Sequence, residues 1–329
     1  MRAVVCNQFG PPSEPGVLGV EERADPEPGP GSVAVDVQAA GVNFVDALFV
    51  GGRYQIRPPL PFVPGTESAG TVVTLGEGVS GLRVGQRVLV SAGLGGFATR
   101  LVAPASAVTV VPDNLDFARA ATFAQSYSTS LFALRDRAGL GVAPGQSVLV
   151  LGAGGGVGLA AIGVARALGC RVLAVASSEE KRAAAQGAGA EAVVDPATES
   201  VKDAARAWAG GTGVDVVLDP IGGELAEPSL RALGDGGRYL VIGFASGTIP
   251  SLPLNQVLLR NRTVVGVDWG IWAMQNPALQ DALLADLLAM VAAGTLDPVA
   301  PAPYPFDEAA RALDDLLGRR TVGKIALIP

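Results

Sequence analysis

The sequence predicts an α/β protein in which a doubly wound parallel-sheet domain is inserted in a barrel-like, mostly-β domain. Residues 1–120 carry short apolar runs separated by Gly and Pro clusters, and beyond them similar runs alternate with helical segments. Short strands between turns are typical of an antiparallel barrel, and strands alternating with helices are typical of a doubly wound sheet. The predicted boundaries are 1–122 with 268–329 for the barrel-like domain, and 123–267 for the inserted one.

Each expected strand is a short apolar, β-branched run bounded by turn residues. In the barrel-like domain these runs are Ala3–Cys6, Ser32–Ala40, Ser68–Leu75, Arg87–Val90, Ala98–Val102 and Val108–Val111. Those of the inserted domain are apolar enough to be buried on both faces of a parallel sheet. They are Ser147–Leu151, Arg171–Ala176, Ala192–Asp195, Asp215–Asp219, Arg238–Ile242 and Thr263–Val267. We then expect helices at about 277–293 and 307–317, and a closing strand, Lys324–Ile328, that returns to the first domain.

The composition excludes several classes of function. The net charge is −7 with no long basic run, which argues against nucleic-acid binding. The N-terminus lacks the layout of a signal peptide, and no uninterrupted apolar run reaches the roughly 20 residues of a membrane span, so we expect a cytoplasmic protein without membrane contact. There is no histidine, and the only cysteines are Cys6 and Cys170. Histidine-based catalysis and a four-cysteine zinc site are therefore excluded.

A glycine-rich turn follows the first strand of the inserted domain. Ser147–Leu151 leads into Gly152–Gly158, and a helix continues to about Leu168. Glycine lets the backbone approach a pyrophosphate and lets the helix pack closely on the strand. The helix N-terminus adds N–H donors and a positive dipole end. In this strand–turn–helix setting we interpret the segment as a dinucleotide-binding turn rather than a plain packing turn.

The end of the second strand indicates which dinucleotide binds. An enzyme that uses NAD usually places Asp or Glu there to hold the ribose 2′-hydroxyl, but this chain has Ser177 and Ser178, followed by Lys181 and Arg182. Hydroxyls and cations suit the 2′-phosphate of NADPH. The alternative is a simple helix start, with Ser177 as the N-cap and Glu180 completing a capping box. The two glutamates after Ser178 are the observation that favours NADH.

Taken together, the sequence resembles the quinone oxidoreductase branch of the medium-chain dehydrogenase/reductase superfamily over essentially its whole length. The segments that carry the resemblance are Ala40–Asp46, Gly52–Tyr54, Pro64–Gly70, Gly81–Val88, Gly152–Gly158, Gly243–Gly247 and Gly323–Ile325. The first domain is then expected to be GroES-like. The alcohol dehydrogenases of the superfamily have a zinc-ligand cysteine where this chain has Asn43 and a zinc-ligand histidine where it has Thr66. The resemblance therefore implies a zinc-independent reductase of quinones, or of C=C bonds conjugated to a carbonyl.

The resemblance also implies the site residues. Residues similar to Asn43 and Tyr54 line the cleft beside the nicotinamide, so these two are the expected catalytic residues; the alternatives are an Asx turn and a core tyrosine. Thr129 matches a threonine that faces the cofactor, and Arg319 an arginine near the adenosine phosphate; the alternatives are a helix-surface hydroxyl and a solvated helix end. The expected cofactor-binding residues are Asn43, Thr129, Gly155, Gly156, Val157, Gly158, Ser177, Ser178, Lys181, Gly243, Phe244, Ala245 and Arg319.

Gly243, Phe244 and Ala245 follow the fifth strand of the inserted domain, where a doubly wound sheet carries its ligand, although Phe244 is equally consistent with a core residue. The leading functional hypothesis is NADPH-dependent quinone reduction. The alternatives are an ene-reductase, for which Arg53 is the evident cation, and a nucleotide-binding protein without turnover. The sixth strand, Arg262–Val267, is expected at a sheet edge, where pairing with a second copy gives a homodimer; in the alternative, Trp269–Met274 shields it.

Overall fold

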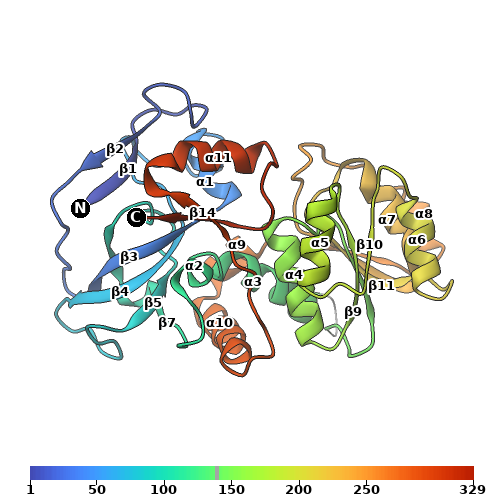
Figure 1. The fold of residues 1–329 in the computed structure, drawn as a ribbon. Helices are drawn as coiled ribbons and strands as arrows, with labels where there is room; N and C mark the ends of the chain where they lie inside the picture. The colour runs from blue at the N-terminus through green and yellow to red at the C-terminus, as the bar shows by residue number, and fades with distance from the viewer. Residues whose placement is uncertain (138–140) are drawn as a thin grey trace. The chain divides into compact units, whose positions relative to one another are not determined.

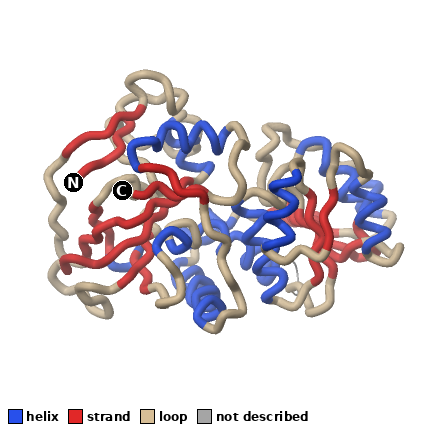
Figure 2. The backbone as a smooth tube through the Cα atoms, viewed as in Figure 1, coloured by secondary structure: helices blue, strands red, loops and turns tan. Residues whose placement is uncertain are grey.

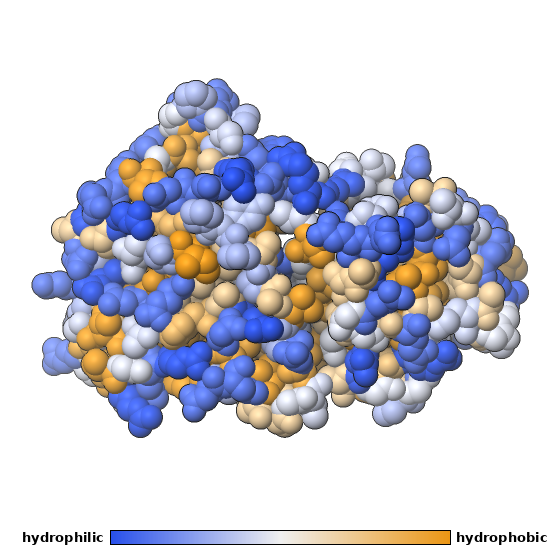
Figure 3. Space-filling view, viewed as in Figure 1, coloured by the Kyte–Doolittle hydropathy of each residue, from blue (hydrophilic) through white to orange (hydrophobic). Residues whose placement is uncertain are grey.

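The computed structural model describes residues 1–137 and 141–329, and the chain divides into two compact units (Figure 1). Unit 1 comprises Met1–Gln125 and Ala300–Pro329, and unit 2 comprises Ser126–Val299. Figure 2 shows the antiparallel-rich sheet of the first and the helix-flanked sheet of the second. The expected fold class, a parallel-sheet domain inserted in a mostly-β domain, is confirmed. On the face drawn in Figure 3, hydrophilic residues alternate with small groups of apolar ones.

Unit 1 is built on a seven-stranded sheet, all within described residues, with the order β14-β15-β3-β4-β5-β7 and with β6 paired to β3. The long strand β3 pairs antiparallel with β4, β6 and β15. Ile325 of β15 stands opposite Val42 of β3, so the chain end returns to the first unit as expected. The elements are β1 (Arg2–Cys6), β2 (Leu18–Glu22), β3 (Ser32–Val42), α1 (Phe44–Val50), β4 (Glu67–Leu75), β5 (Arg87–Val90), β6 (Arg100–Pro104), β7 (Val108–Val110), α2 (Phe117–Ala120), β14 (Ala302–Pro305), α11 (Ala309–Leu317) and β15 (Ile325–Ile328).

Unit 2 contains a parallel sheet whose six strands, all in its described part, have the order β10-β9-β8-β11-β12-β13. Counted from β8 along the chain, this is the doubly wound order 3-2-1-4-5-6. All four residues of β8 are buried, as a strand covered on both faces requires. The elements are α3 (Ala124–Leu131, which starts in unit 1), β8 (Ser147–Val150), α4 (Gly156–Ala167), β9 (Arg171–Val175), α5 (Glu179–Gly187), β10 (Ala192–Val194), α6 (Val201–Trp208), β11 (Val214–Asp219), α7 (Ala226–Ala232), β12 (Leu233–Val241), α8 (Leu254–Leu258), β13 (Thr263–Gly266), α9 (Trp269–Gln275) and α10 (Pro277–Ala292).

The segment 268–299 belongs to unit 2, which differs from the predicted return to the first domain at residue 268. Side-chain contacts explain the difference. Gln280 Nε2 donates to Ser128 Oγ at 3.3 Å, and the rings of Trp272 and Phe132 stack with their centroids 4.3 Å apart. Helices α9 and α10 therefore pack on the helical segment that opens unit 2, and the chain leaves this unit only after Val299.

Strand β13 lies at the edge of the parallel sheet, as expected from the sequence. Val264 is 40% exposed, while residues 269–274 form part of helix α9. Val267 N donates to Val241 O of β12, so by the two-residue alternation of a strand the N–H of Val264 points to the open edge. Arg137 Nε donates to the carbonyl of Gly266 on that edge at 3.0 Å.

Among the described helices, none is long and apolar enough to cross a bilayer.

Candidate active site

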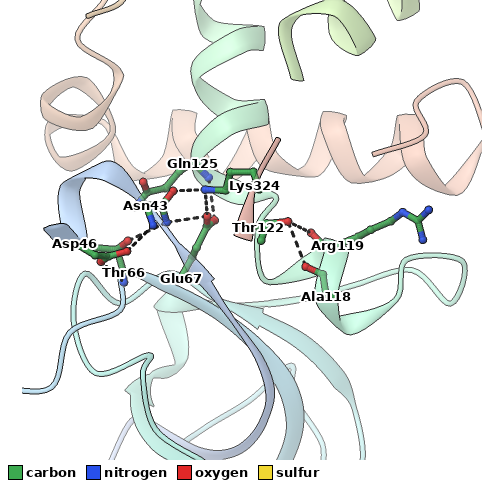
Figure 4. A network of polar contacts seen from close by, with 9 residues as sticks. All are labelled: Asn43, Asp46, Thr66, Glu67, Ala118, Arg119, Thr122, Gln125 and Lys324. Atoms are coloured by element: carbon green, nitrogen blue, oxygen red, sulfur yellow. Dashed lines mark hydrogen bonds and ion pairs between the residues drawn. The ribbon is translucent and has the colours of Figure 1, made fainter. Parts of the chain in front are cut away.

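A buried polar cluster lies at the start of α1 (Figure 4). Strand β3 ends at Val42, and Asn43 is the N-cap of α1, with φ −115° and ψ 156°. Asp46 reaches back from the first turn of the helix: its Oδ2 accepts a hydrogen bond from Asn43 N at 2.8 Å, and its Oδ1 accepts one from Thr66 N at 3.0 Å. Asp46 thus ties the segment before β4 to the helix start. The capping box that Asn43 and Asp46 form agrees with the Asx-turn alternative, and the Asn43 side chain also bonds to other residues of the cluster.

The side-chain amide of Asn43 is held on both sides. Its Nδ2 donates to Glu67 Oε1 at 2.9 Å and to Thr66 Oγ1 at 3.2 Å. Its Oδ1 accepts a hydrogen bond from Lys324 Nζ. Asn43 is only 5% exposed, so these partners, and not solvent, determine its orientation.

Glu67 and Lys324 form an ion pair inside the cluster, with Nζ 3.0 Å from Oε1. The Glu67 side chain is 1% exposed and that of Lys324 is 12% exposed. Glu67 Oε2 accepts a further hydrogen bond from Gln125 N at 3.1 Å. A buried carboxylate is tolerated only when it is paired and hydrogen-bonded, and Glu67 meets both conditions. We name the residues Asn43, Asp46, Thr66, Glu67 and Lys324 the Asn43 cluster.

Burial raises the pKa of Asp46 to about 7, because desolvation penalises its charged form; the N–H of Asn43 and the charge of Lys324 oppose this shift. Asp46 is 0% exposed. The Asn43 cluster therefore holds one carboxylate paired with a cation and a second one whose charge is costly to bury.

Tyr54 lies a few residues beyond α1 and is partly buried. Its ring lies 4.8 Å from that of Phe49, between centroids, at an interplanar angle of 59°. It packs against the core of unit 1, so the core alternative for Tyr54 describes part of its environment. Its catalytic role stays a prediction. Arg53, next to it, is exposed.

In unit 2, the glycine-rich turn connects β8 to α4 as expected. Gly152 has a φ of +57°, a region that favours glycine, and Gly155 is the N-cap of the twelve-residue helix α4. A β-carbon at Gly158 would lie 2.7 Å from Ala153 Cα, and closer still to the carbonyl oxygen of Gly152. The backbone of the turn and the backbone of the helix are thus in direct contact, with no room for a side chain at Gly158. The N–H groups of the first helical turn have no intrahelical acceptor and are available to a phosphate.

The residues predicted to read the 2′-phosphate lie beside this turn. Ala153 N donates to Val175 O at 3.0 Å, which joins the turn to the end of β9. A β-carbon at Gly154 would lie 2.5 Å from Lys181 Cγ, so the Lys181 side chain runs along the turn. Ser177 and Ser178 are exposed.

The start of helix α5 differs from the capping box considered as the alternative. The N-cap is Ser178 and not Ser177, and the Ser178 side chain accepts a hydrogen bond from Lys181 N at 3.3 Å. The third helical residue is therefore Lys181, whereas the expected capping box needs Glu180 at that position. Ser177 lies one residue before the cap, so capping does not engage it. Arg182 forms an ion pair with Asp195, which follows β10, at 2.9 Å. The charge of Arg182 is therefore paired within the protein.

A third buried carboxylate, Asp219, organises the carboxyl end of the parallel sheet. Its Oδ1 accepts hydrogen bonds from Ile221 N at 2.7 Å and Gly222 N at 2.8 Å, and its Oδ2 accepts one from Tyr239 Oη at 2.6 Å. Burial raises the pKa of Tyr239, so this hydroxyl stays protonated and donates. Ile221 in turn contacts the glycine-rich turn: a β-carbon at Gly152 would lie 2.6 Å from its Cγ1.

The segment after β12 is joined to the same region. Ala245 N donates to Pro220 O at 3.1 Å, and Gly243 follows the strand end. Phe244 is 40% exposed, so the core alternative for it is wrong. One edge of the parallel sheet thus carries several of the cofactor-binding residues predicted in unit 2. They are the glycine-rich turn, Lys181 and the segment Gly243–Ala245. Thr129 lies in α3 and is partly buried.

Arg319 lies in unit 1, one residue beyond the C-cap of α11, with a φ of +55°. It is exposed, in agreement with the helix-end alternative. Its contact with an adenosine phosphate stays a prediction. Sequence reasoning missed Glu67, Asp46 and Lys324 as site residues, although all three lie inside the segments that carry the family resemblance; membership of those segments was the available signal.

The residues at the superfamily's zinc positions do not fit zinc. The amide of Asn43 is committed to Glu67 and Lys324, and a lysine ammonium beside it repels a cation. Cys6 and Cys170 are buried and belong to different units. Across residues 1–137 and 141–329, no group of three or more Cys, Asp or Glu residues is arranged to hold a metal ion. Zinc prefers thiolate, imidazole and carboxylate ligands in such sites.

Fold and site together define a two-unit dehydrogenase or reductase with a dinucleotide-binding turn. Comparisons agree with this class: residues 29–113 match the alcohol dehydrogenase GroES-like domain, and residues 156–283 match the family described as zinc-binding dehydrogenase. The chain is 37% identical over 330 residues to the quinone oxidoreductase-like protein 2 homolog of Nematostella vectensis, covering 99% of this chain and 88% of the relative.

Solved structures give the same assignment. The quinone oxidoreductase of Thermus thermophilus, also solved in complex with NADPH, is 36% identical to this chain with a TM-score of 0.84. The match covers 100% of this chain and 100% of that one. A structure described as an NAD-dependent alcohol dehydrogenase is 31% identical with a TM-score of 0.90, again over all of both chains. The chain belongs to the quinone oxidoreductase branch of the medium-chain dehydrogenase/reductase superfamily. It is an oxidoreductase.

Proposed function

We propose that the chain is an NADPH-dependent quinone oxidoreductase that works without zinc. The observation that carries the proposal is the Asn43 cluster, which has an amide and a hydroxyl at the two zinc-ligand positions. The amide of Asn43 bonds to the Glu67–Lys324 ion pair and to the hydroxyl of Thr66. Zinc normally polarises an alcohol or carbonyl oxygen. Without it, the suitable acceptors are those that take a hydride readily, such as a quinone.

NADPH is the proposed cofactor, and the residues present fit it. The pyrophosphate would bind at Gly155–Gly158, where the N–H groups of Gly156, Val157 and Gly158 can donate to it, while that of Gly155 donates to Gly152 O. A β-carbon at Gly158 would fill the close approach between turn and helix. The 2′-phosphate would be bound by Ser177, Ser178 and Lys181, the last of which lies along the turn. NADPH is also present in the complex of the Thermus thermophilus relative. When bound, it would supply the hydride.

Asn43 and Tyr54 remain the proposed residues at the nicotinamide. Because both amide hydrogens of Asn43 are used inside the cluster, it would present an acceptor oxygen to the cofactor or substrate. Gly243, Phe244 and Ala245 would bound the cofactor at the end of β12, where Phe244 offers an exposed ring. Thr129 and Arg319 are proposed as further cofactor contacts. The protein is proposed to be a cytoplasmic homodimer.

One panel of substrates tests the proposal. Purified protein, treated with a chelator, is assayed for NADPH and NADH oxidation against quinones, enones and enoyl thioesters. We expect the highest kcat/KM with NADPH and a quinone, unchanged by the chelator. Faster turnover of an enone or an enoyl thioester assigns the chain to the ene-reductases instead, with the exposed Arg53 as the cation for a carboxylate or phosphate. Cofactor binding without turnover of any acceptor supports a non-catalytic nucleotide-binding protein.

A further inference from the structure

Within the described part of the chain, the Asn43 cluster leaves one donor hydrogen without a partner. Both amide hydrogens of Asn43 go to Thr66 and Glu67, and both oxygens of Asp46 accept backbone N–H groups. Lys324 uses one N–H on Asn43 Oδ1 and one on Glu67 Oε1. The Thr66 hydroxyl donates a hydrogen bond to the Asp46 carboxyl. Among the described residues, the donor that remains in the cluster is therefore the third N–H of Lys324.

The orientation of the Asn43 amide follows from its partners' chemistry. Lys324 has donors and no acceptor, so it must face Oδ1, and the ionised carboxylate of Glu67 has only acceptors, so it must face Nδ2. A flipped amide would set NH₂ against ammonium and oxygen against carboxylate. Asn43 therefore offers a ligand no donor, and a substrate carbonyl oxygen needs a donor from another residue.

Lys324 is thus the donor that the cluster can offer to a ligand, and its ammonium is a strong one. An ammonium makes a shorter and stronger hydrogen bond to an oxyanion than a neutral hydroxyl does. The side chain of Lys324 retains 12% exposure, against 1% for Glu67, and two hydrogen bonds fix its Nζ in place. A donor that is already oriented before the reaction stabilises developing charge without reorganisation.

We propose that Lys324 is a further catalytic residue: its ammonium donates the third N–H to the substrate carbonyl oxygen. This inference rests on the proposed quinone reduction. A ring carbon of the quinone accepts a hydride from NADPH, the electron pair of the C=C bond moves onto the oxygen at Lys324, and this oxygen takes a proton from solvent. The same ring carbon then loses a proton to solvent while the second carbonyl oxygen gains one, which gives the hydroquinone. The sum is NADPH + quinone + H⁺ → NADP⁺ + hydroquinone. Lys324 thereby supplies the polarisation that zinc supplies in the metal-dependent enzymes.

The test must separate this role from that of a structural ion pair. Lys324→Met alone would leave Glu67 buried without its partner and is expected to unfold the protein. The decisive variant is Lys324→Met/Glu67→Gln, which removes both charges together. We expect its kcat with a quinone to fall at least about 100-fold, the usual cost of one oxyanion donor. The Kd for NADPH, measured by fluorescence titration, should stay within about threefold of the wild-type value, and Lys324→Arg, which keeps a cationic donor, should retain more than about a tenth of kcat.

A matched control removes an ion pair elsewhere in unit 1. Arg100 of β6 pairs with Asp36 of β3, and Arg100→Met/Asp36→Asn should leave kcat unchanged. The inference about Lys324 is overturned if Lys324→Met/Glu67→Gln, folded by circular dichroism, reduces a quinone or enone as fast as the wild type. The proposed function fails separately, through a wild-type protein that reduces enones and no quinone.

Discussion

Gly158→Ala tests whether the close packing of the glycine-rich turn serves cofactor binding. The new methyl carbon would lie 2.7 Å from Ala153 Cα and still nearer Gly152 O. Both neighbours are backbone atoms, so no side-chain rotation relieves the contact, and helix and turn must move apart by about 1 Å to reach ordinary contact distance. Overpacking of this kind costs about 1–3 kcal/mol, against a gain of up to about 1 kcal/mol in helix propensity.

We therefore expect Gly158→Ala to lower the free energy of unfolding by about 1–2 kcal/mol and the Tm by roughly 2–8 °C. The Kd for NADPH should rise at least tenfold, because the displaced N–H groups no longer converge on the pyrophosphate. Thermal denaturation and NADPH fluorescence titration measure the two effects. Gly187→Ala in α5 is the control, since a β-carbon there meets nothing within 4 Å; it should leave the Kd unchanged. A Gly158→Ala protein with wild-type Tm and Kd refutes the argument.

Three further predictions concern the cofactor, the buried carboxylate and the sheet edge. Ser177→Asp should raise the Kd for NADPH by a charge repulsion on the order of 1–3 kcal/mol, and equal NADPH and NADH affinities in the unmutated protein would contradict the assignment of Ser177. Since the pKa of Asp46 is raised to about 7 in the fold and is near 4 when unfolded, the contribution of Asp46 to the free energy of unfolding should fall as pH rises from about 4 to about 7, by on the order of 4 kcal/mol. Urea titrations should show a smaller fall in Asp46→Asn, and identical pH profiles would refute the shift. Light scattering at micromolar concentration should give a dimer that Val264→Pro, which removes an outward N–H of β13, converts to a monomer; a wild-type monomer would exclude the edge-to-edge dimer.

Much of the fold is predictable because its strands are local patterns. The runs at 147–151 and 171–176 are β-branched and bounded by turns, and they became β8 and β9 within one residue of the expected ends. The end of the inserted domain was harder to predict. Helix α10 carries apolar residues such as Leu283 and Leu287, but apolarity alone does not say which of two cores receives a helix, so the sequence does not show that the segment 268–299 belongs to unit 2.

The candidate site likewise has a part that the sequence predicts and a part that it does not. The glycine-rich turn is contiguous in sequence, so the sequence predicts its residues together. The Asn43 cluster depends on Lys324, which lies 281 residues from Asn43 in the sequence and meets it only because β15 pairs with the end of β3. A contact of that range has no periodicity or spacing to reveal it. Likewise, the hydrogen bonds of Asp219 follow from the folded carboxyl edge of the sheet and leave no local signal.

The central claim, hydride transfer from NADPH to a quinone without metal, is tested most directly by a single-turnover measurement. Metal-stripped protein is mixed with a quinone and NADPH that carries deuterium at the transferred position, and NADPH oxidation and hydroquinone formation are followed together. We predict equal amounts of both products and a primary isotope effect, with or without chelator. NADPH that stays unoxidised, or oxidation that returns only when zinc is added, would contradict the claim.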